Sequence, residues 1–431
     1  MDTHNQTSQS PEAQNVASEV SARNPQGRGV IGDSPLAKSL NSNRKYYWYM
    51  VLSMVLLSML GSFVNDMYTP ALPAMTKFFG CSVSLGQMGL TMGMIGLGLG
   101  QFILGPVSDK LGRKTVLIAS ISLFVVMAVV SVLSPNIHIF NACRLLQGVG
   151  ASGGYFLART IPTDVFAGRN LAKLMALVGA INGIAPASAP VIGGLAADAW
   201  GWKGVFLLLA AFAALLLLNS FKMQESLAVD RRSKVPFLKS FGGYLNLLKN
   251  KPYMIHTWLK GTSLGLLFTY IASSPFILQN LYGLSQTQYG LVIGFNAIFS
   301  AVGSMIALKC HPFKKAATMG AILLTVGTAG SAVCLWTIHN IWLYEIFAVV
   351  MLFVMGMIFS TSNTMAMNEG RANAGEAAAL LGIAGYVVGA IASPLVGIGN
   401  ILHSTAIVYG ALTALVLTLA LASNRLPSNL D

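Results

Sequence analysis

One carboxylate, Asp66, stands inside a run of apolar residues that is long enough to cross a membrane. It belongs to the sequence Asn65-Asp66-Met67-Tyr68-Thr69-Pro70 and follows Tyr46, where the run begins, by twenty residues. An ionised carboxylate within a membrane span costs several kcal/mol unless it is paired or hydrated, which makes Asp66 a candidate for exchanging protons or cations. A second interpretation stays open, because twenty residues of helix rise about 30 Å and place Asp66 near the outer interface.

A cation, Arg144, stands in another apolar run, within Arg144-Leu145-Leu146-Gln147-Gly148. Arginine keeps its charge at any useful pH, so a buried arginine needs compensating partners. The run enters the membrane near Ile137, which puts Arg144 about 10 Å deep, close to the depth of Asp66. We therefore expect the two side chains to share a cavity in which Arg144 influences the protonation of Asp66. The alternative is a structural arginine that reaches outward to the interface.

The apolar run 171–196 contains prolines and glycines at close spacing: Pro186, Pro190, Gly193 and Gly194. A proline inside a helix removes a backbone donor and kinks the helix. Small residues let a neighbouring helix approach closely. The pattern favours a kinked helix at a moving interface, although an ordinary kinked packing helix has the same composition.

A polar island, Gly105-Pro-Val-Ser-Asp-Lys-Leu-Gly-Arg-Lys-Thr115, separates two apolar runs. It combines Asp109 with the cations Lys110, Arg113 and Lys114. Short loops rich in Lys and Arg stay on the cytoplasmic side of a membrane, so we expect this loop there.

The composition is that of a protein with many membrane spans. Of 431 residues, 54% are hydrophobic and 10% are charged, whereas about a quarter of the residues of a soluble domain are charged. A helix needs about twenty apolar residues to cross a hydrocarbon core of ~30 Å. By that measure the sequence predicts an all-α membrane protein with twelve spans, at about 46–70, 85–107, 115–134, 137–160, 171–196, 203–221, 253–279, 287–308, 315–337, 341–363, 374–400 and 402–422.

The basic residues of the loops fall almost entirely on one side of this topology. Only Lys77 and Lys203 lie near loops of the opposite face. The asymmetry predicts that both termini are cytoplasmic. We therefore interpret the net charge of +13 as a topology signal and a contact with anionic lipid headgroups, and we expect no binding of nucleic acid.

The chain divides into two similar halves. Pro190 and Gly193 match Pro394 and Gly397 at an offset near 204 residues, which favours two pseudo-symmetric six-helix bundles around a central cavity. The amino-terminal stretch is rich in Ser, Asn and Gln and is predicted to be disordered. The predicted parts are a disordered cytoplasmic tail (1–45), a first bundle (46–221), a basic cytoplasmic linker (222–252) and a second bundle (253–425).

The motifs of several other function classes are absent from the sequence. It contains no Gly-x-x-x-x-Gly-Lys-Ser/Thr phosphate loop, no His-Glu-x-x-His and no Gly-x-Ser-x-Gly, so ATP-driven transport and these hydrolytic chemistries are not supported. The four cysteines are scattered without metal-ligand spacing. We expect no enzyme activity, no cofactor and no metal, and a monomeric protein.

Several of these segments resemble those of one family. Gly105–Thr115 is similar to the signature loop between helices 2 and 3 of major facilitator superfamily transporters, and Arg144–Gly148 is similar to the proton-linked signature of helix 4. Gly179–Gly194 is similar to the antiporter signature of helix 5. With Asn65–Pro73 and Ser274–Gly290, the chain resembles the Bcr/CflA branch of the drug:proton antiporters.

The resemblance implies a proton-coupled exporter of amphipathic small molecules in a bacterial inner membrane. It implies proton coupling by Asp66 and Arg144, with one proton per cycle as the simplest case, because 46–70 holds one carboxylate where some relatives have two. The implied gating residues are Gly105, Asp109, Arg113, Pro186, Pro190, Gly193 and Gly194. The candidates for contact with substrate in the cavity are Asn65, Tyr68, Gln147, Tyr155, Asn182, Tyr270 and Asn296.

Two other functions stay open at this point. One is the dedicated export of a native metabolite, such as a siderophore or an amino-acid derivative, and the other is a sensor that does not transport. Lys260 and Glu345 also stand inside apolar runs without an assigned role. Each lies near the end of its run, so its long side chain can reach back to the membrane interface.

Overall fold

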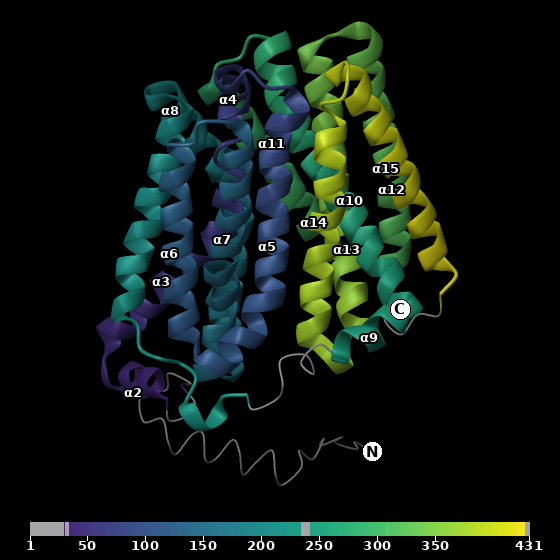
Figure 1. The fold of residues 1–431 in the computed structure, drawn as a ribbon. Helices are drawn as coiled ribbons and strands as arrows, with labels where there is room; N and C mark the ends of the chain where they lie inside the picture. Colours follow the sequence, from purple (N-terminus) through teal and green to yellow (C-terminus); the bar gives the residue numbers. More distant parts are fainter. Residues whose placement is uncertain (1–29, 31–33, 234–241, 308, 427–431) are drawn as a thin grey trace, which may run out of the picture.

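The structure is a computed structural model that describes residue 30 and residues 34–233, 242–307 and 309–426. The described part is helical, and its one β-type contact is an isolated bridge between Val30 and Phe166. The long helices lie roughly along one axis and form two groups side by side (Figure 1). This arrangement is the all-α fold with two six-helix bundles that the sequence predicts.

The first bundle contains the long helices of the first half of the chain. Its side chains share one apolar core in which Leu60, Phe124 and Phe206 are fully buried. Its elements are α3 (Arg44–Asp66), η1 (Thr69–Ala71), α4 (Leu72–Phe79), α5 (Val83–Leu111), α6 (Arg113–Val132), α7 (Ile137–Val165) and α8 (Gly168–Lys222).

The second bundle has its own core, which includes Leu266, Leu324 and Ile358. It follows η2 (Val229–Arg231) and the short helix α9 (Gly242–Lys249) of the linker. Its elements are α10 (Lys251–Pro275), η4 (Phe276–Leu281), α11 (Gln286–Ala307), α12 (Phe313–Val333), η5 (Cys334–Ile338), α13 (Ile341–Glu369), η6 (Arg371–Asn373), α14 (Ala374–Leu395) and α15 (Ile401–Asn424).

The described helices account for the twelve predicted spans. Ten helical segments of the described part are long and apolar enough to cross a membrane. One of the ten, α8, is two helices that meet at Gly201, where a φ of 68° lies in the left-handed region that favours glycine. Helix α7 is a further 29-residue helix of the first bundle. It is missing from the ten because Arg144 and other polar residues lower its hydropathy.

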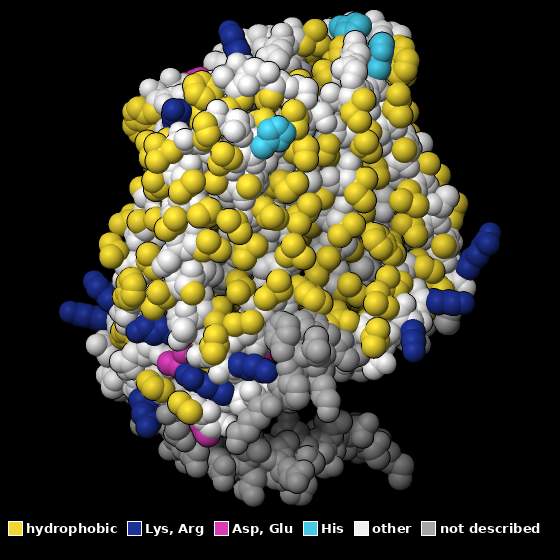
Figure 2. All heavy atoms as spheres, viewed as in Figure 1, with side chains coloured by type: hydrophobic (Ala, Val, Ile, Leu, Met, Phe, Trp, Pro, Cys, Tyr) yellow, Lys and Arg dark blue, Asp and Glu magenta, His cyan; other side chains and the backbone are white. Residues whose placement is uncertain are grey.

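Charge distinguishes the two ends of the molecule. Apolar side chains cover the middle of the visible face, and Lys and Arg gather mainly toward one end of it (Figure 2). We call this the basic end and define it by Arg44, Lys114, Lys222, Lys249 and Lys314. The other end, where the turns at Gly80, Gly201, Gly283 and Gly399 have positive φ, is the opposite end.

A short helix at the basic end differs from the predicted disorder of residues 1–45. Residues 34–45 are ordered as α2 (Pro35–Ser42) and the start of α3, while 1–29 and 31–33 lie outside the described residues. The Ser34 side chain accepts a hydrogen bond from the Ala37 amide and caps the helix. Leu36 and Leu40, four residues apart on one face, are fully buried. The composition of the tail hid this local pattern.

The two bundles contact one another mainly in the half of the molecule near the opposite end. Gln87 donates a hydrogen bond to the Ala272 carbonyl at 3.0 Å, and Gln279 donates to the Pro70 carbonyl at 2.9 Å. The Thr287 amide donates to Asp198 at 2.9 Å. These bonds join residues of different bundles, so they close the opposite end.

Glycines make this closure tight. A Cβ on Gly194 of α8 would collide with the Gln286 carbonyl and lie 3.0 Å from the Thr287 Cα of the second bundle. A Cβ on Gly290 of α11 would collide in turn with the Pro190 carbonyl. Toward the basic end, by contrast, Gly382 of α14 has no atom of another element within 4 Å of its ideal Cβ position. The bundles therefore meet at one end and separate toward the other.

We predict that Gly194→Val weakens the closure of the opposite end, because the added methyl groups have no room against α11. Spin labels on Lys203→Cys and Gln288→Cys, in a chain whose native cysteines are replaced by serine, should report longer distances in the variant. Gly179→Val is the matched control, since the Gly179 Cβ position on the same helix meets nothing within 4 Å. Equal distance distributions in Gly194→Val and the control would contradict this account.

Candidate functional site

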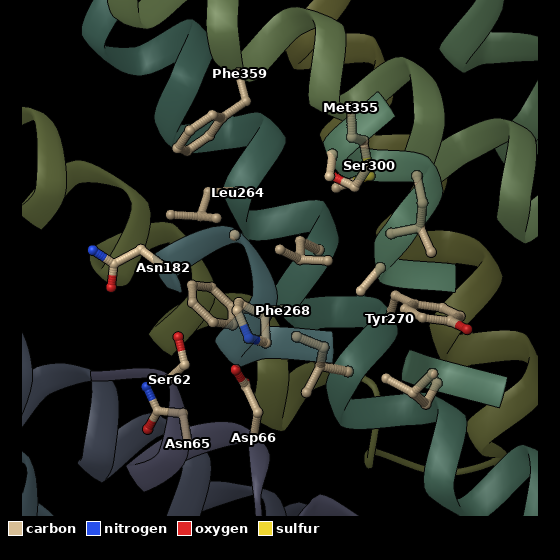
Figure 3. A pocket seen from close by; sticks show the side chains of 18 of the residues that line it. Ser62, Asn65, Asp66, Asn182, Leu264, Phe268, Tyr270, Ser300, Met355 and Phe359 are labelled. Carbon is tan, nitrogen blue, oxygen red and sulfur yellow. The ribbon is translucent and has the colours of Figure 1, made fainter. Parts of the chain in front are cut away.

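A cavity of about 350 Å³ lies between the two bundles. Its volume is in the range of small-molecule binding sites. Helices α3, α7 and α8 of the first bundle and α10, α11, α13 and α14 of the second contribute its walls. Most lining side chains are apolar, and Phe268, Leu264, Met355 and Phe359 stand around the space in Figure 3. The site therefore suits a molecule with a large apolar part.

The carboxyl group of Asp66 lies at this cavity, near the end of α3 (Figure 3). The residue is 8% exposed, and among the described residues no ion pair or hydrogen bond engages its carboxylate oxygens. Its backbone carbonyl accepts a hydrogen bond from Thr69 at 2.8 Å, which fixes the turn after α3. A carboxylate that is held at a cavity wall without a charged partner can exchange a proton or meet a cationic group from solution.

Polar side chains near Asp66 come from three helices. Asn65 and Ser62 of α3, Tyr155 of α7 and Asn182 of α8 line the cavity. Both amide atoms of Asn182 and the Oδ1 atom of Asn65 are buried without a hydrogen-bond partner. Buried polar atoms without partners are costly, so the Asn182 amide is available to a bound molecule or water. The Asn65 Oδ1 atom lies instead on the side of Gly93 of α5 and Arg144.

Arg144 lies behind the cavity wall and is fully buried. Its guanidinium donates hydrogen bonds to the Val64 carbonyl of α3 at 2.5 Å and to the Gly89 carbonyl of α5 at 3.3 Å. A third bond, to Gln147 on α7, is 2.6 Å long. Arg144 thus joins three helices through backbone carbonyls. The expected shared cavity with Asp66 is not observed, because the Arg144 side chain is not at the lining and forms no ion pair with Asp66.

The remaining predicted cavity residues divide between the lining and the layer behind it. Tyr270 lines the cavity, as predicted. Tyr68, Gln147 and Asn296 lie one layer back. The Tyr68 ring packs 4.2 Å from the Arg144 guanidinium carbon, and the Gln147 amide donates to the Met127 carbonyl at 3.1 Å. Their other contacts turn these side chains away from the cavity.

Asn296 connects the cavity wall to Glu345. Its amide donates to the Tyr270 hydroxyl and to the Glu345 carboxylate, each at 2.7 Å. The Glu345 Oε1 atom is buried without a partner. The expected reach of Glu345 to the membrane interface is therefore wrong, because its side chain turns into the second bundle.

Lys260 also differs from the expectation of a side chain that reaches the interface. It is 8% exposed, and its ammonium group donates to the Asn363 side chain on α13 at 2.9 Å. The ammonium nitrogen lies 4.6 Å from the centre of the Phe359 ring, which lines the cavity. The sequence contained a signal for this position: Lys260 precedes the lining residues Ser263 and Leu264 by three and four positions on one helix face.

The prolines and glycines of α8 have different roles at different heights of the helix. Pro186 and Pro190 line the cavity. One turn further on, a Cβ on Gly193 would collide with the Met67 carbonyl of the α3 end, and Gly194 packs against α11 as described above. The helix therefore leaves the cavity wall and enters the closed contact within two turns.

The basic end holds Asp109, which the sequence placed in a loop but which lies in the last turn of α5, because only Gly112 separates α5 from α6. Arg113 pairs with Asp109 at 2.5 Å and with Asp164 of α7 at 3.1 Å, and these are the two carboxylates that form ion pairs among the described residues. Glu225 of the linker accepts hydrogen bonds from the amides of Arg113 and Lys114 and so caps α6. Gly105 has ordinary packing room beside Phe156.

A metal centre is not indicated by the described side chains. Among them, no group of three or more His, Cys, Asp or Glu residues lies close enough to hold a metal ion.

The fold and the cavity define a class: membrane transporters built from two helical bundles around a central binding site. The family model of the Major Facilitator Superfamily matches residues 54–394. The chain belongs to this superfamily.

Relatives and solved structures agree with this assignment. The uncharacterized MFS-type transporter YdgK of Bacillus subtilis is 34% identical over 85% of this chain and 92% of its own length. Multidrug resistance protein D of Escherichia coli is 26% identical over 77% of this chain and 84% of its own length. The bicyclomycin resistance protein homolog of Haemophilus influenzae is also 26% identical, over 82% of this chain and 90% of its own length. The resemblance to the Bcr/CflA-type drug exporters is thereby confirmed.

Two solved structures share the fold at low sequence identity. A bacterial homolog of the human lysosomal transporter Spinster, in an inward-facing and unoccupied conformation, gives a TM-score of 0.72 at 13% identity and covers 89% of this chain and 98% of its own. A D-xylose–proton symporter gives a TM-score of 0.69 at 15% identity and covers 90% of this chain and 99% of its own.

We predict that Arg144→Lys lowers the free energy of unfolding by about 2–5 kcal/mol, because a single ammonium nitrogen cannot lie within hydrogen-bond distance of three acceptors that are spaced around the planar guanidinium, and each buried carbonyl left unpaired costs about 1–3 kcal/mol. Thermal unfolding in detergent measures the change. Arg169→Lys, at an exposed position, is the control and should unfold like the original protein. An unchanged midpoint for Arg144→Lys would show that the three hydrogen bonds do not stabilise the bundle.

We also predict that Asp109→Asn slows transport without changing substrate affinity. Asp109 lies at the basic end away from the cavity, and Asp164 and Ser108 continue to hold Arg113 when the Asp109 charge is removed. The variant should therefore alter the balance between conformations and leave the binding site intact. Equilibrium binding in detergent and transport rate in proteoliposomes separate the two effects. A large loss of affinity at an unchanged rate would be incompatible with this assignment.

Proposed function

We propose that this protein exports amphipathic small molecules in exchange for protons across the inner membrane of a bacterium. The observation that carries the proposal is the position of Asp66, a carboxylate without an ion-pair partner among the described residues, at the wall of a cavity between two bundles. The relatives named for multidrug and bicyclomycin resistance support drugs as one group of substrates.

The cavity supports alternating access as the mechanism. It lies where the bundles separate, and the contacts of Gly194, Gly290 and Gln87 close it toward the opposite end. A molecule then enters from the basic end and leaves after the bundles have closed there and parted at the other end. In this cycle the glycines of α8 and α11 form and release the outer contact.

Asp66 is the proposed proton carrier. The Asp66 carboxylate binds a proton while the cavity is open to one side of the membrane. It releases this proton after the cavity has opened to the other side. Arg144 acts as a positioning residue: it holds the Val64 carbonyl, two residues before Asp66, and thereby fixes the end of α3. One carrier of this kind fits one proton per cycle.

The basic end is proposed to face the cytoplasm. Lys and Arg dominate this end (Figure 2), and cytoplasmic loops of membrane proteins carry the excess of basic residues. The end of α15 and the start of α3 both lie there (Figure 1), so both termini are cytoplasmic in this orientation. Gating at this end would use the Asp109–Arg113 ion pair, which joins the end of α5 to the start of α6. We propose a monomer as the transporting unit, because one chain supplies every wall of the cavity.

We predict that Asp66→Asn abolishes proton-driven export and leaves folding and insertion intact, because asparagine keeps the size of the side chain but cannot carry the exchanged proton. Efflux of ethidium from proteoliposomes with an imposed pH gradient should fall to the level of protein-free vesicles. Asp230→Asn, an exposed change in the linker, is the matched control and should transport normally. Proton-driven efflux at the control rate by Asp66→Asn would refute the proposed role of Asp66.

A further inference from the structure

A second charged layer lies beside the cavity, one helical turn closer to the basic end. On α10, Lys260 continues the face that holds the lining residues Ser263, Leu264 and Leu267. On α7, Arg159 follows the lining residue Tyr155 by four positions, which places the two side chains on one face. The two cations come from different bundles, Arg159 from α7 and Lys260 from α10.

Both side chains are fixed by neighbours of the cavity rather than by acids. Arg159 donates to the Tyr155 hydroxyl at 2.7 Å, and its guanidinium carbon lies 4.3 Å from the centre of the Tyr155 ring. Lys260 uses one of its three donors on Asn363, which follows the lining residue Phe359 by one turn of α13. Tyrosine, asparagine and phenylalanine hold these cations in place without neutralising them.

The charge of Lys260 is not compensated within the described residues. All ion pairs there involve Arg113, so no described carboxylate lies within ion-pair distance of Lys260 or Arg159. Lys260 is only 8% exposed, and a buried cation is costly unless it is paired with an anion. An anionic group that enters the cavity supplies this missing partner.

We propose that Lys260 and Arg159 form a subsite for an anionic group of the transported molecule. This proposal adds a class of substrate to the proposed function, and it rests on that function for the claim that the bound molecule is transported. Substrates that use this subsite carry a carboxylate, sulfonate or phosphate on an apolar body, and the apolar body lies against Phe268, Leu264 and Phe359. Lys260 and Ile271, which lines the deep part of the cavity, are about 16 Å apart along α10 at 1.5 Å per residue.

Three probes with the same ring system test the subsite: 1-naphthaleneacetate, its neutral amide 1-naphthaleneacetamide, and the cation 2-(1-naphthyl)ethylamine. Calorimetric titration of the purified full-length protein in detergent measures their binding without any transport step. We expect the acetate to bind the original protein more tightly than the amide. In Lys260→Met the affinity for the acetate should fall about tenfold to hundredfold, as for the loss of one charge-assisted hydrogen bond, while the affinity for the amide stays unchanged.

Two further variants separate charge from general damage. Lys251→Met changes an exposed lysine at the start of the same helix and should bind all three probes like the original protein. Arg159→Gln should lose acetate affinity, and Arg159→Lys should retain most of it. Equal affinities of the original protein for acetate and amide would overturn the subsite, as would equal losses for all three probes in Lys260→Met.

Export measurements then distinguish the two proposals. If Asp66→Asn stops export of the amide but Lys260→Met binds acetate normally, the subsite is wrong and the proposed function stands. If acetate binding depends on Lys260 but the original protein moves no probe along a pH gradient, the subsite stands and the proposed function is wrong.

Discussion

Every polar group inside these bundles must find its partner within the protein, because the hydrocarbon of a membrane offers none. Arg144 meets this constraint with the carbonyls of Val64 and Gly89 and the side chain of Gln147. At the basic end Arg113 meets it with Asp109 and Asp164. Asp66 and Lys260 are held without a counter-ion among the described residues, and both adjoin the cavity. Away from the cavity the two buried arginines are thus fully bonded, whereas Asp66 and Lys260 lack a counter-ion where a solute can enter.

The same constraint explains where the bundles are able to part. Near the opposite end they meet through backbone carbonyls and glycines, with Gly194 against Gln286 and Gly290 against Pro190. Close packing of small residues supplies the attraction between helices that apolar side chains cannot supply in lipid. Such contacts carry no buried ion pair that separation would leave unpaired. The closed end can therefore open at a modest cost, whereas the hydrogen bonds of Arg144 hold α3 and α5 to α7.

The sequence predicted the spans, including the separation of 171–196 from 203–221, because apolar length is a local property. It also placed Asp66, Asn65, Asn182 and Tyr270 at the cavity. It was wrong about Arg144, because periodicity places a side chain on a helix face but does not show which backbone carbonyls the neighbouring helices present to it. Lys260 and Glu345 were misplaced for a related reason: position in a span gives depth, while the direction of the side chain depends on partners such as Asn363 and Asn296. Helix α2 was not predicted, because the tail was judged by its overall polar composition and not by the local cap at Ser34 and the spacing of Leu36 and Leu40.

Uncompensated charge at the cavity explains how the proposed exchange is coupled. While the cavity is open to water, solvent stabilises the charges of Asp66 and Lys260. Closing the basic end would remove this water, and burying an unpaired charge costs several kcal/mol even after the protein relaxes. Each 1.4 kcal/mol lowers the population of the closed state about tenfold, so an empty and fully charged carrier rarely closes. A proton on Asp66, or an anionic group against Lys260 and Arg159, removes part of that cost. The bundles then change sides mainly when a proton or a substrate is bound, and this condition is what turns two opposing fluxes into an exchange.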